Sequence, residues 1–398
     1  MDIAAGDRLD AETQSGGMGK RRTHAFSRQN PVRSIQNDQD ALRRHAVGAI
    51  AGEGYRYHQA KGDCIGNHRD SFHGRYAQAD DRSLRRLHRA TQPSHTARRT
   101  CDMFRPYLDR WNLIPDGEAI TTPTGCLLPV RQKGQPAMLK LATVEEERSG
   151  AALMEWWEGD GAAPVLARDD NALLLERARS VGGLADMARG GRDDEACLIL
   201  CTVAARLHAP RSKPLPKLIP LKQWFRELDE AAATHGGILV RCAATASQLL
   251  ADPRDLCVLH GDLHHGNVLD FGPRGWLAID PKGLIGERGF DFANIFCNPD
   301  LDDPTRPVAT DPARFVRRLE IATAAARLER LRLLHWILAW AGLSAAWFLG
   351  DDQSADIDLT IAALAAAEST APKSRVEHFV GYTRARASLV RSYGRRAL

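Results

Sequence analysis

The chain has 398 residues, of which 43% are hydrophobic and 26% are charged, and its formal net charge is +4. This composition excludes collagen-like and low-complexity chains, and the length allows two or three domains. The charge is uneven, because residues 1–102 and 371–398 each carry +6 and residues 103–370 therefore carry −8. An acidic central segment argues against nucleic acid as a partner and favours a cationic ligand.

The eight cysteines show no C-x-x-C spacing, which is typical of a protein in a reducing, cytoplasmic compartment. Cys197 and Cys201 are four residues apart in an apolar helical pattern, which predicts core packing instead of metal binding. The N-terminus shows no apolar stretch of signal-peptide length. The most apolar run, Leu333 to Leu349, has 17 residues and contains His335. We therefore expect a buried helix there and no membrane span.

Residues 1–102 show no sustained helical or strand periodicity. Such a polar segment cannot bury enough apolar surface to offset the entropy lost on ordering. We expect it to be disordered or to be an extension upstream of a start at Met103, with a basic nucleic-acid-binding arm as the alternative. The basic tail at residues 371–398 is expected to be solvated or loosely docked.

Residues 103–177 have the pattern of a small, sheet-rich lobe. Apolar runs around turn residues predict strands at 127–130 and 137–141, followed by a helix at 145–157 with its acidic residues in the first turn. Two more short strands are predicted at 163–167 and 172–176.

Residues 178–370 have the pattern of a larger, mainly helical lobe. Helices are predicted at 193–208, 221–234, 313–349 and 356–368, and two short strands around 258–279 interrupt them. The fold class is therefore α+β, with a sheet-rich N-lobe and a helical C-lobe.

The segment from His260 to Asn267, H-G-D-L-H-H-G-N, carries the polar residues of a strand–loop–strand unit. Asp262 and Asn267 are five residues apart, which is the spacing of a kinase catalytic loop, and Asp280 follows the next strand. Phosphoryl transfer needs one carboxylate to deprotonate the attacking hydroxyl, and an amide with a second carboxylate to hold Mg²⁺. Asp and Asn also cap turns, which is the structural alternative.

The pattern H-G-D-x-H-x-G-N followed by I-D-P resembles the catalytic signature of aminoglycoside phosphotransferases, which are relatives of protein kinases. Further segments are similar to the streptomycin 6-phosphotransferase branch, which includes kinases described as acting on hydroxyurea; they are residues 127–132, 136–140, 205–211, 275–281 and 342–348. The resemblance covers about 103–370. It implies a two-lobed protein-kinase-like fold, divided at 177/178, that uses ATP and Mg²⁺.

By this resemblance, Asp262 is the catalytic base, and Asn267 and Asp280 are the Mg²⁺ ligands. His260 braces the loop through hydrogen bonds, and Asp291 ties the loop backbone together.

The resemblance also implies a nucleotide site in the N-lobe. Lys140 would grip the α- and β-phosphates of ATP, paired with Glu147 or with the glutamate before it. Glu176 and Ala178 would lie in the hinge that offers backbone groups to adenine. The turn at residues 121–125 would cover the phosphates, although it lacks the G-x-G-x-x-G pattern of protein kinases.

The acceptor implied by the branch is streptomycin, phosphorylated at its 6-hydroxyl, with antibiotic resistance as the consequence. Its two guanidinium groups and its amine require an acidic pocket. Glu287, Asp300 and Asp302 are the expected contacts, and a solvated acidic loop is the alternative.

Three other functions remain open at this point. A kinase of the same fold could act on hydroxyurea, another aminoglycoside, an amino alcohol or a sugar. A metal-dependent hydrolase could use His260, Asp262, His264 and His265, although alternation along an extended loop would send the last two to opposite sides. A catalytically silent module with a kinase-like fold is the third possibility.

Overall fold

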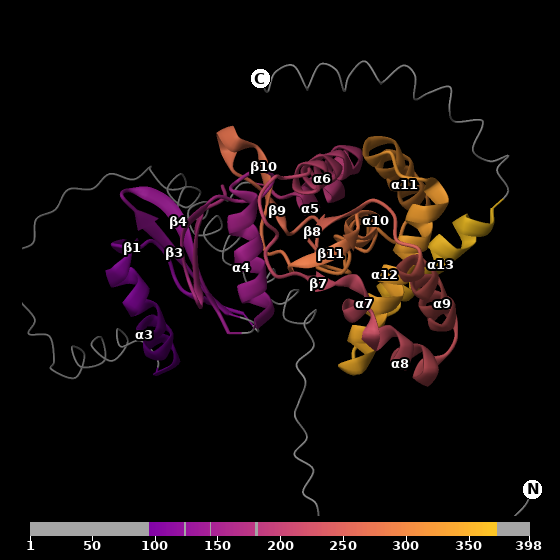
Figure 1. Ribbon diagram of the computed structural model, residues 1–398, viewed down its shortest axis with the longest axis horizontal. Coiled ribbons are helices and arrows are strands. Elements are labelled where there is room, and N and C mark those ends of the chain that lie inside the picture. The colour runs from indigo at the N-terminus through magenta and orange to yellow at the C-terminus, as the bar shows by residue number, and fades with distance from the viewer. Residues whose placement is uncertain (1–94, 123–124, 144, 180–181, 372–398) are drawn as a thin grey trace, which may run out of the picture.

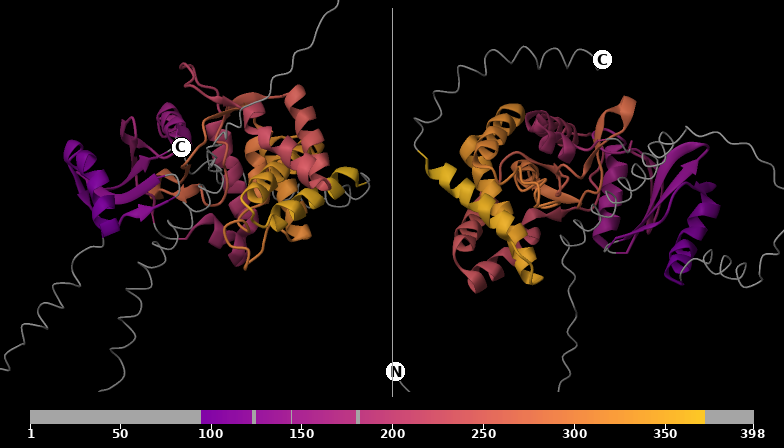
Figure 2. Two further views of the ribbon diagram at one scale, coloured as in Figure 1. Left: turned by 90° about the horizontal axis from the view of Figure 1, so that it is seen from below. Right: turned by 180° about the vertical axis from the view of Figure 1, so that it is seen from behind.

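The computed structural model describes residues 95–122, 125–143, 145–179 and 182–371 (Figure 1). The predictions made for residues 1–94 and 372–398 lie outside this range. Within it, a sheet-rich lobe comes first along the chain and a helical lobe follows, as the sequence predicted (Figure 2). The α+β prediction is confirmed.

The first described helix, α3 (His95–Arg110), crosses the boundary that the sequence placed at residue 103. Phe104 is fully buried, and Tyr107, Leu108 and Trp111 pack in the same apolar cluster against the sheet. Their spacing of three, four and seven residues places them on one helical face. The helix therefore belongs to the N-lobe.

The N-lobe sheet is antiparallel, with strand order β1-β3-β4-β6-β5 and β2 paired to β3. Lys133 and Gly134 form its central two-residue turn and both have positive φ, which suits the right-handed twist of a hairpin. The four predicted strands are present, and two very short ones, β1 and β2, were not predicted. The strands are β1 (Leu113–Pro115), β2 (Ile120–Thr121), β3 (Gly125–Gln132), β4 (Gln135–Ala142), β5 (Val165–Asp169) and β6 (Ala172–Glu176).

Helix α4 (Glu145–Trp157) lies on the other side of the sheet from α3, next to the C-lobe (Figure 1). Leu153, Met154 and Trp157 are almost fully buried and belong to the main core, which continues into the C-lobe. The helix is thus packed between the lobes.

The C-lobe is built around α12 (Arg330–Gly350), which contacts α8, α9, α10, α11 and α13. This helix is long and apolar enough to span a membrane, but 78% of its most apolar window is buried inside the protein. A helix that is apolar on all sides is typical of a core position. The prediction of a buried helix is confirmed.

Two predicted helices are interrupted. The pattern at 313–349 forms two helices with a break at Arg327, which has a left-handed φ of 51°, and the pattern at 221–234 divides at Phe225. Helix α9 was not predicted. The helices not yet given are α5 (Leu184–Met187), η1 (Ala188–Arg192), α6 (Asp193–Leu207), α7 (Leu221–Trp224), α8 (Arg226–His235), α9 (Ile238–Ala251), η2 (Gly272–Arg274), α10 (Gly289–Ala293), η3 (Asn294–Phe296), α11 (Pro312–Ala326) and α13 (Asp356–Thr370).

The strands on either side of the polar loop do not pair with each other. The strand before the loop, β8 (Leu256–Leu259), pairs with β11 (Leu284–Glu287), which also pairs with β7 (Ile219–Pro220). The strand after it, β9 (Val268–Asp270), pairs with β10 (Trp276–Ala278). The loop therefore joins two small sheets, and the expected strand–loop–strand unit is not a hairpin.

Candidate functional site

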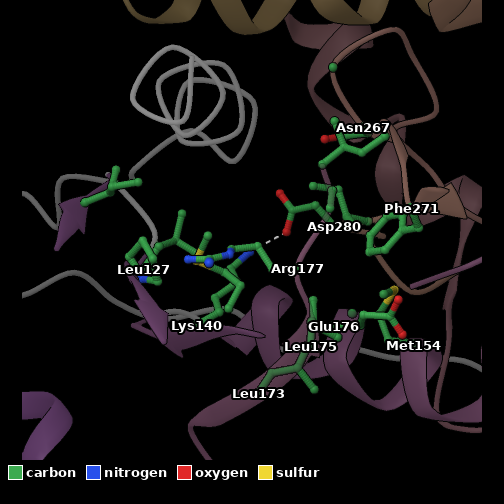
Figure 3. A pocket seen from close by; sticks show the side chains of 18 of the residues that line it. Leu127, Lys140, Met154, Leu173, Leu175, Glu176, Arg177, Asn267, Phe271 and Asp280 are labelled. Atoms are coloured by element: carbon green, nitrogen blue, oxygen red, sulfur yellow. Dashed lines mark hydrogen bonds and ion pairs between the residues drawn. The ribbon is translucent and has the colours of Figure 1, made fainter. Parts of the chain in front are cut away.

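A cavity of about 1300 Å³ lies between the lobes. Strands β3, β4 and β6 and helix α4 line it from the N-lobe, and the segments around Asn267, Asp280 and Asp302 line it from the C-lobe (Figure 3). Single-ligand pockets commonly enclose about 300–1,000 Å³, so this cavity is large enough for two substrates.

The polar loop after β8 is held by a buried carboxylate. Asp291, on α10, accepts hydrogen bonds from the backbone N–H groups of His260 and Gly261, both at 2.8 Å, and its Oδ2 lies 2.8 Å from Nε2 of His208. Gly261 has a φ of 86°, and a Cβ there would lie 2.8 Å from a methyl group of Leu284. Only glycine fits this tight turn.

The ring of His260 joins the loop to the segment that carries Asp280. Its Nε2 lies 2.9 Å from the carbonyl oxygen of Ile279, and the backbone carbonyl of His260 accepts from the backbone N–H of Lys282 at 2.7 Å. Burial lowers the pKa of His260 to about 4, so the ring is neutral at physiological pH. His260 and Asp291 thus occupy the supporting positions expected of them.

Two amides hold the carboxylate of Asp262. Asn267 Nδ2 donates to Asp262 Oδ2 at 2.9 Å, and Asn294 Nδ2 donates to Asp262 Oδ1 at 2.7 Å. Asp262 is 7% exposed and is not among the residues lining the cavity, whereas Asn267, which contacts it, lines the cavity. His264 Nε2 lies 3.8 Å from Asp262 Oδ1, and the His265 ring lines the cavity.

Asp280 lies beside Asn267. The backbone N–H of Ile279 donates to the carbonyl of Asn267 at 2.9 Å, and both Asp280 and Asn267 line the cavity (Figure 3). Asp280 has a left-handed φ of 66°, which is uncommon for a residue with a side chain and is typical of functional sites. The structure therefore brings Asp262, Asn267 and Asp280 together at one end of the cavity.

Two lysines and two carboxylates, one of them Asp280, form a compact ionic cluster. Lys140 pairs with Glu147 Oε2 and with Asp280 Oδ1. Lys282 lies 3.9 Å from Glu147 Oε1 and 3.5 Å from Asp280 Oδ2. The pairing of Lys140 with Glu147 is as predicted, and the side chain of the preceding glutamate lies outside the described residues.

The charges in this cluster shift the acidities of its members. Burial by itself would raise the pKa of Asp280, but the ammonium groups of Lys140 and Lys282 outweigh it and hold that pKa well below its usual range. Burial would likewise lower the pKa of Lys282, but the carboxylates of Asp280 and Glu147 raise it.

The pKa of Asp262 is shifted in the opposite direction from that of Asp280. Burial raises its pKa to about 8, against the effect of the positive charge of Lys282. A pKa near the operating pH is the property that suits a general base.

The predicted hinge residues Glu176 and Ala178 line the cavity. Thr121, Thr122 and Gly125 of the predicted phosphate turn are not among the residues lining the cavity, and the other two residues of that turn lie outside the described range. Residues 116–118, between β1 and β2, line the cavity. The role expected for the turn at residues 121–125 therefore stays a prediction.

Of the three predicted acceptor contacts, only Asp302 lines the cavity. Asp300 is buried and accepts hydrogen bonds from the backbone N–H groups of residues 308–310. Glu287 is buried and binds the side chains of Arg332 and Trp336. The structure thus places these two carboxylates inside the C-lobe, away from the cavity, where they hold loops and helices together.

The cavity wall is acidic. Eleven Asp and Glu residues and five Lys and Arg residues are among those that line it. Asp302 and Asp303 lie on the C-lobe side, together with Asp186 and Arg189. The negative balance that the sequence showed for residues 103–370 is therefore present where a ligand would bind.

The donor set suits Mg²⁺ shared with phosphates. Mg²⁺ prefers hard oxygen ligands and is commonly held by one or two carboxylates together with substrate phosphates. An amide and a carboxylate, Asn267 and Asp280, are the cavity-lining groups of this kind at the polar loop. Across the described part of the chain, no group of three or more His, Cys, Asp and Glu residues could hold a metal ion by itself, so the hydrolase alternative has no ligand cluster there.

Sequence reasoning did not identify Lys282 or Asn294. The signal for Lys282 was its position two residues after Asp280, which brings it back toward the same site. For Asn294 the signal was a spacing of three residues from Asp291, which places both on one face of the α10–η3 segment.

Residues 110–352 match the model of a family described as aminoglycoside/hydroxyurea antibiotic resistance kinase. A streptomycin 3''-kinase of Klebsiella pneumoniae is 57% identical over 262 residues, which is 65% of this chain and 98% of that protein. A streptomycin 6-kinase of Streptomyces griseus is 33% identical over 274 residues, 62% of this chain and 82% of that protein. A solved choline/ethanolamine kinase family protein from Mesorhizobium loti matches with a TM-score of 0.49 at 14% identity, covering 70% of this chain and 96% of that one.

Proposed function

Because the chain belongs to the aminoglycoside/hydroxyurea antibiotic resistance kinase family, we propose that it transfers the γ-phosphoryl group of ATP to a hydroxyl group of streptomycin. The observation that carries the proposal is the meeting of Asp262, Asn267 and Asp280 at one end of an acidic cavity that is large enough for two substrates.

In this proposal each residue has a defined task. Asp262 takes the proton of the acceptor hydroxyl while the acceptor oxygen bonds to the γ-phosphorus and the β,γ-bridging oxygen leaves with ADP. Lys140, which Glu147 positions, binds phosphate oxygens. Asn267 and Asp280 would hold Mg²⁺, which neutralises charge on the phosphates when it is bound.

The charge of the cavity supports a cationic acceptor. Carboxylates outnumber cationic side chains among the lining residues, and Asp302 and Asp303 lie on the C-lobe side of the cavity. Guanidinium and ammonium groups form strong, charge-assisted hydrogen bonds with carboxylates. Hydroxyurea is neutral and would gain little from the negative charge of the cavity wall. We therefore favour streptomycin over hydroxyurea, and propose Asp302 as an acceptor contact.

The position of phosphorylation has two candidates. The streptidine 6-hydroxyl is the one predicted from the sequence, and the name of the Streptomyces griseus relative supports it. The name of the Klebsiella pneumoniae relative, at 57% identity, supports the 3''-hydroxyl. The two hydroxyls lie on different rings, so phosphorus–proton correlation NMR of the product distinguishes them.

The test incubates the protein with ATP, Mg²⁺ and one acceptor at a time from streptomycin, kanamycin, hygromycin and hydroxyurea. We expect a mass gain of one phosphate on streptomycin alone, and a higher inhibitory concentration of streptomycin for bacteria that express the protein. Asp262→Asn is the matched control. It keeps the side chain's size and should bind ADP, but its kcat should fall by about 10²–10⁴-fold. Phosphorylation of another acceptor in preference to streptomycin would overturn the assignment.

A further inference from the structure

The carboxylate of Asp262 receives a second amide from outside the polar loop. Asn294, on the η3 turn, donates from Nδ2 to Asp262 Oδ1 at 2.7 Å, while Asn267 donates to Oδ2 at 2.9 Å. All three side chains are buried. We infer that Asn294 is a positioning residue for the base of the reaction, an inference that rests on the proposed function of Asp262.

A further asparagine fixes the orientation of Asn294. Asn298 Nδ2 donates to Asn294 Oδ1 at 2.8 Å and to the Asn294 carbonyl at 3.2 Å. With its oxygen engaged by Asn298, the amide of Asn294 must turn its N–H₂ group toward Asp262. A carboxylate can only accept, so the two contacts agree on one orientation of the amide.

The series of hydrogen bonds that begins at Asp262 ends in the helical core of the C-lobe. The carbonyl of Asn298 accepts a hydrogen bond from Arg318 Nη1 at 2.5 Å, and Arg318 is buried on α11. Arg318 in turn forms a two-nitrogen ion pair with Asp193, on α6, at 3.0 and 2.6 Å. The hydrogen bond to the base thus starts from a rigid part of the C-lobe.

The arrangement fixes the direction in which Asp262 can act. Each carboxylate oxygen has two lone pairs, and each accepts one amide hydrogen bond, which leaves one lone pair on each for the acceptor hydroxyl. Rotation of the carboxylate about its Cβ–Cγ bond would break both amide contacts. A misplacement of the reacting groups by about 1 Å can cost about 10²-fold in rate. Loss of Asn294 should therefore lower turnover more than nucleotide binding.

The test compares two variants of Asn294, which contacts Asp262, with one variant of Asn298, which contacts Asn294. Asn294→Ala removes the donor, Asn294→Asp keeps the size but replaces the donor by an acceptor, and Asn298→Ala removes the group that orients Asn294. Steady-state kinetics with streptomycin and ADP binding by calorimetry are the readouts. Thr245→Ala, which changes a buried polar residue of α9 that does not line the cavity, is the control.

We expect Asn294→Ala to lower kcat by about 10–100-fold, with KM for ATP and affinity for ADP within twofold of wild type. Asn294→Asp should lose at least as much turnover, Asn298→Ala less, and Thr245→Ala less than twofold. A kcat within twofold of wild type in Asn294→Asp or Asn294→Ala would overturn the inference. Equal losses of turnover and ADP affinity would also overturn it, because they indicate a general structural role.

A ligand-free crystal structure of Asn294→Asp provides a readout that does not depend on the acceptor. The Asp262 carboxylate should rotate away from its wild-type orientation, and an unchanged orientation contradicts the positioning role. If wild-type protein leaves streptomycin unmodified, the proposed acceptor is wrong, whereas the position of the Asp262 carboxylate still decides the inference about Asn294.

Discussion

Lys282 contributes a buried positive charge to the site that the sequence analysis did not identify. It is 3% exposed and lies between the same two carboxylates that Lys140 binds, on their other oxygen atoms. Glu147 therefore keeps one cationic partner if Lys140 turns toward phosphates. Without Lys282, the carboxylates of Glu147 and Asp280 would lose one of the two positive charges that lie beside them.

The change Lys282→Met keeps the length of the side chain and removes its charge. We expect KM for ATP to rise about tenfold, because the two carboxylates attract Lys140 more strongly once the charge of Lys282 is removed; this corresponds to about 1.4 kcal/mol. Lys282→Arg should restore part of the affinity. Steady-state kinetics check both variants, and a KM for ATP that is unchanged in Lys282→Met would show that the second lysine is dispensable.

The pH dependence of turnover should follow Asp262. Burial raises the pKa of this carboxyl to about 8, and the base must be deprotonated to accept the hydroxyl proton. We expect kcat/KM to rise about tenfold per pH unit below about pH 8 and to level off above it. Rates measured between pH 5.5 and 9.5 test this, and a profile that is flat from pH 6 upward would contradict it.

The raised pKa of Asp262 also means that ionising this residue lowers the stability of the folded protein. Between pH 4 and 8 the folded protein binds this proton more tightly than the unfolded chain does, so rising pH lowers the free energy of unfolding. Asp262→Asn cannot ionise and removes this loss. The new amide N–H₂ group meets one of the two amide donors, and this cost does not depend on pH. We therefore expect the melting temperature of the variant, relative to that of wild type, to rise by at least about 2 °C between pH 5 and pH 8, since 1 kcal/mol corresponds to about 2–4 °C. Melting curves at the two pH values provide the comparison, and a difference between variant and wild type that is the same at both would refute this account.

At the scale of elements, the close contact between α4 and the loop after β10 determines the ionic cluster. Gly150 of α4 faces the carbonyl oxygen of Pro281, and a Cβ at this position would lie 2.2 Å from that oxygen. No other residue allows the helix that carries Glu147 to come so close to the segment that carries Asp280 and Lys282.

Gly150→Ala should therefore push α4 away from the loop. We expect kcat/KM for ATP to fall at least about tenfold and the melting temperature to fall as well, since both ion pairs of Glu147 depend on this spacing. Gly350→Ala is the matched control, because nothing lies within 4 Å of a Cβ at that helix end. The two variants are compared by kinetics and thermal melting, and equal behaviour of both would refute the role given to Gly150.

The strand pairing around the polar loop also helps to place Asp280 beside Asp262. Since β8 pairs with β11 and β9 pairs with β10, the loop is held from two sheets, and Asp280 follows β10 directly into the same site. A simple hairpin would have left Asp280 without such support. Small local sheets thus bring together residues that are 18 positions apart in the sequence, Asp262 and Asp280.

At the scale of the whole molecule, the described residues that line the cavity all fall between Asp116 and Asp303. Helix α3 lies on the far side of the N-lobe sheet from α4 and contributes the fully buried Phe104 to the smaller core. The helix supports the sheet that carries Lys140 without touching the cavity itself.

Two truncations follow from this arrangement. A chain that begins at His95 should keep kcat and KM within twofold of the full chain, because it retains every described residue that lines the cavity. A chain that begins at Leu113 lacks α3 and should melt at least about 6 °C lower, since loss of one buried Phe side chain costs about 3–5 kcal/mol. Kinetics and thermal melting test both chains, and an inactive His95 chain would refute the first expectation.

The sequence by itself determined the fold class and pointed to the polar residues, Asp262, Asn267 and Asp280, that the structure brings together. Strands and helices of ordinary length have a visible periodicity, and the spacing of Asp262 and Asn267 is local information. It did not reveal two very short strands, the break at Arg327 or the true extent of α3, because these depend on packing against other elements.

Only the tertiary structure decided which carboxylates face the cavity and which hold the protein together. The sequence alone does not distinguish the carboxylates of Asp300, Asp302 and Glu287. In the structure Asp300 and Glu287 bind groups inside the C-lobe, and Asp302 lines the cavity. Lys282 and Asn294 reach the site through contacts between distant segments. The physical reason is that a side chain's environment, unlike its local conformation, is set by residues far away in the chain.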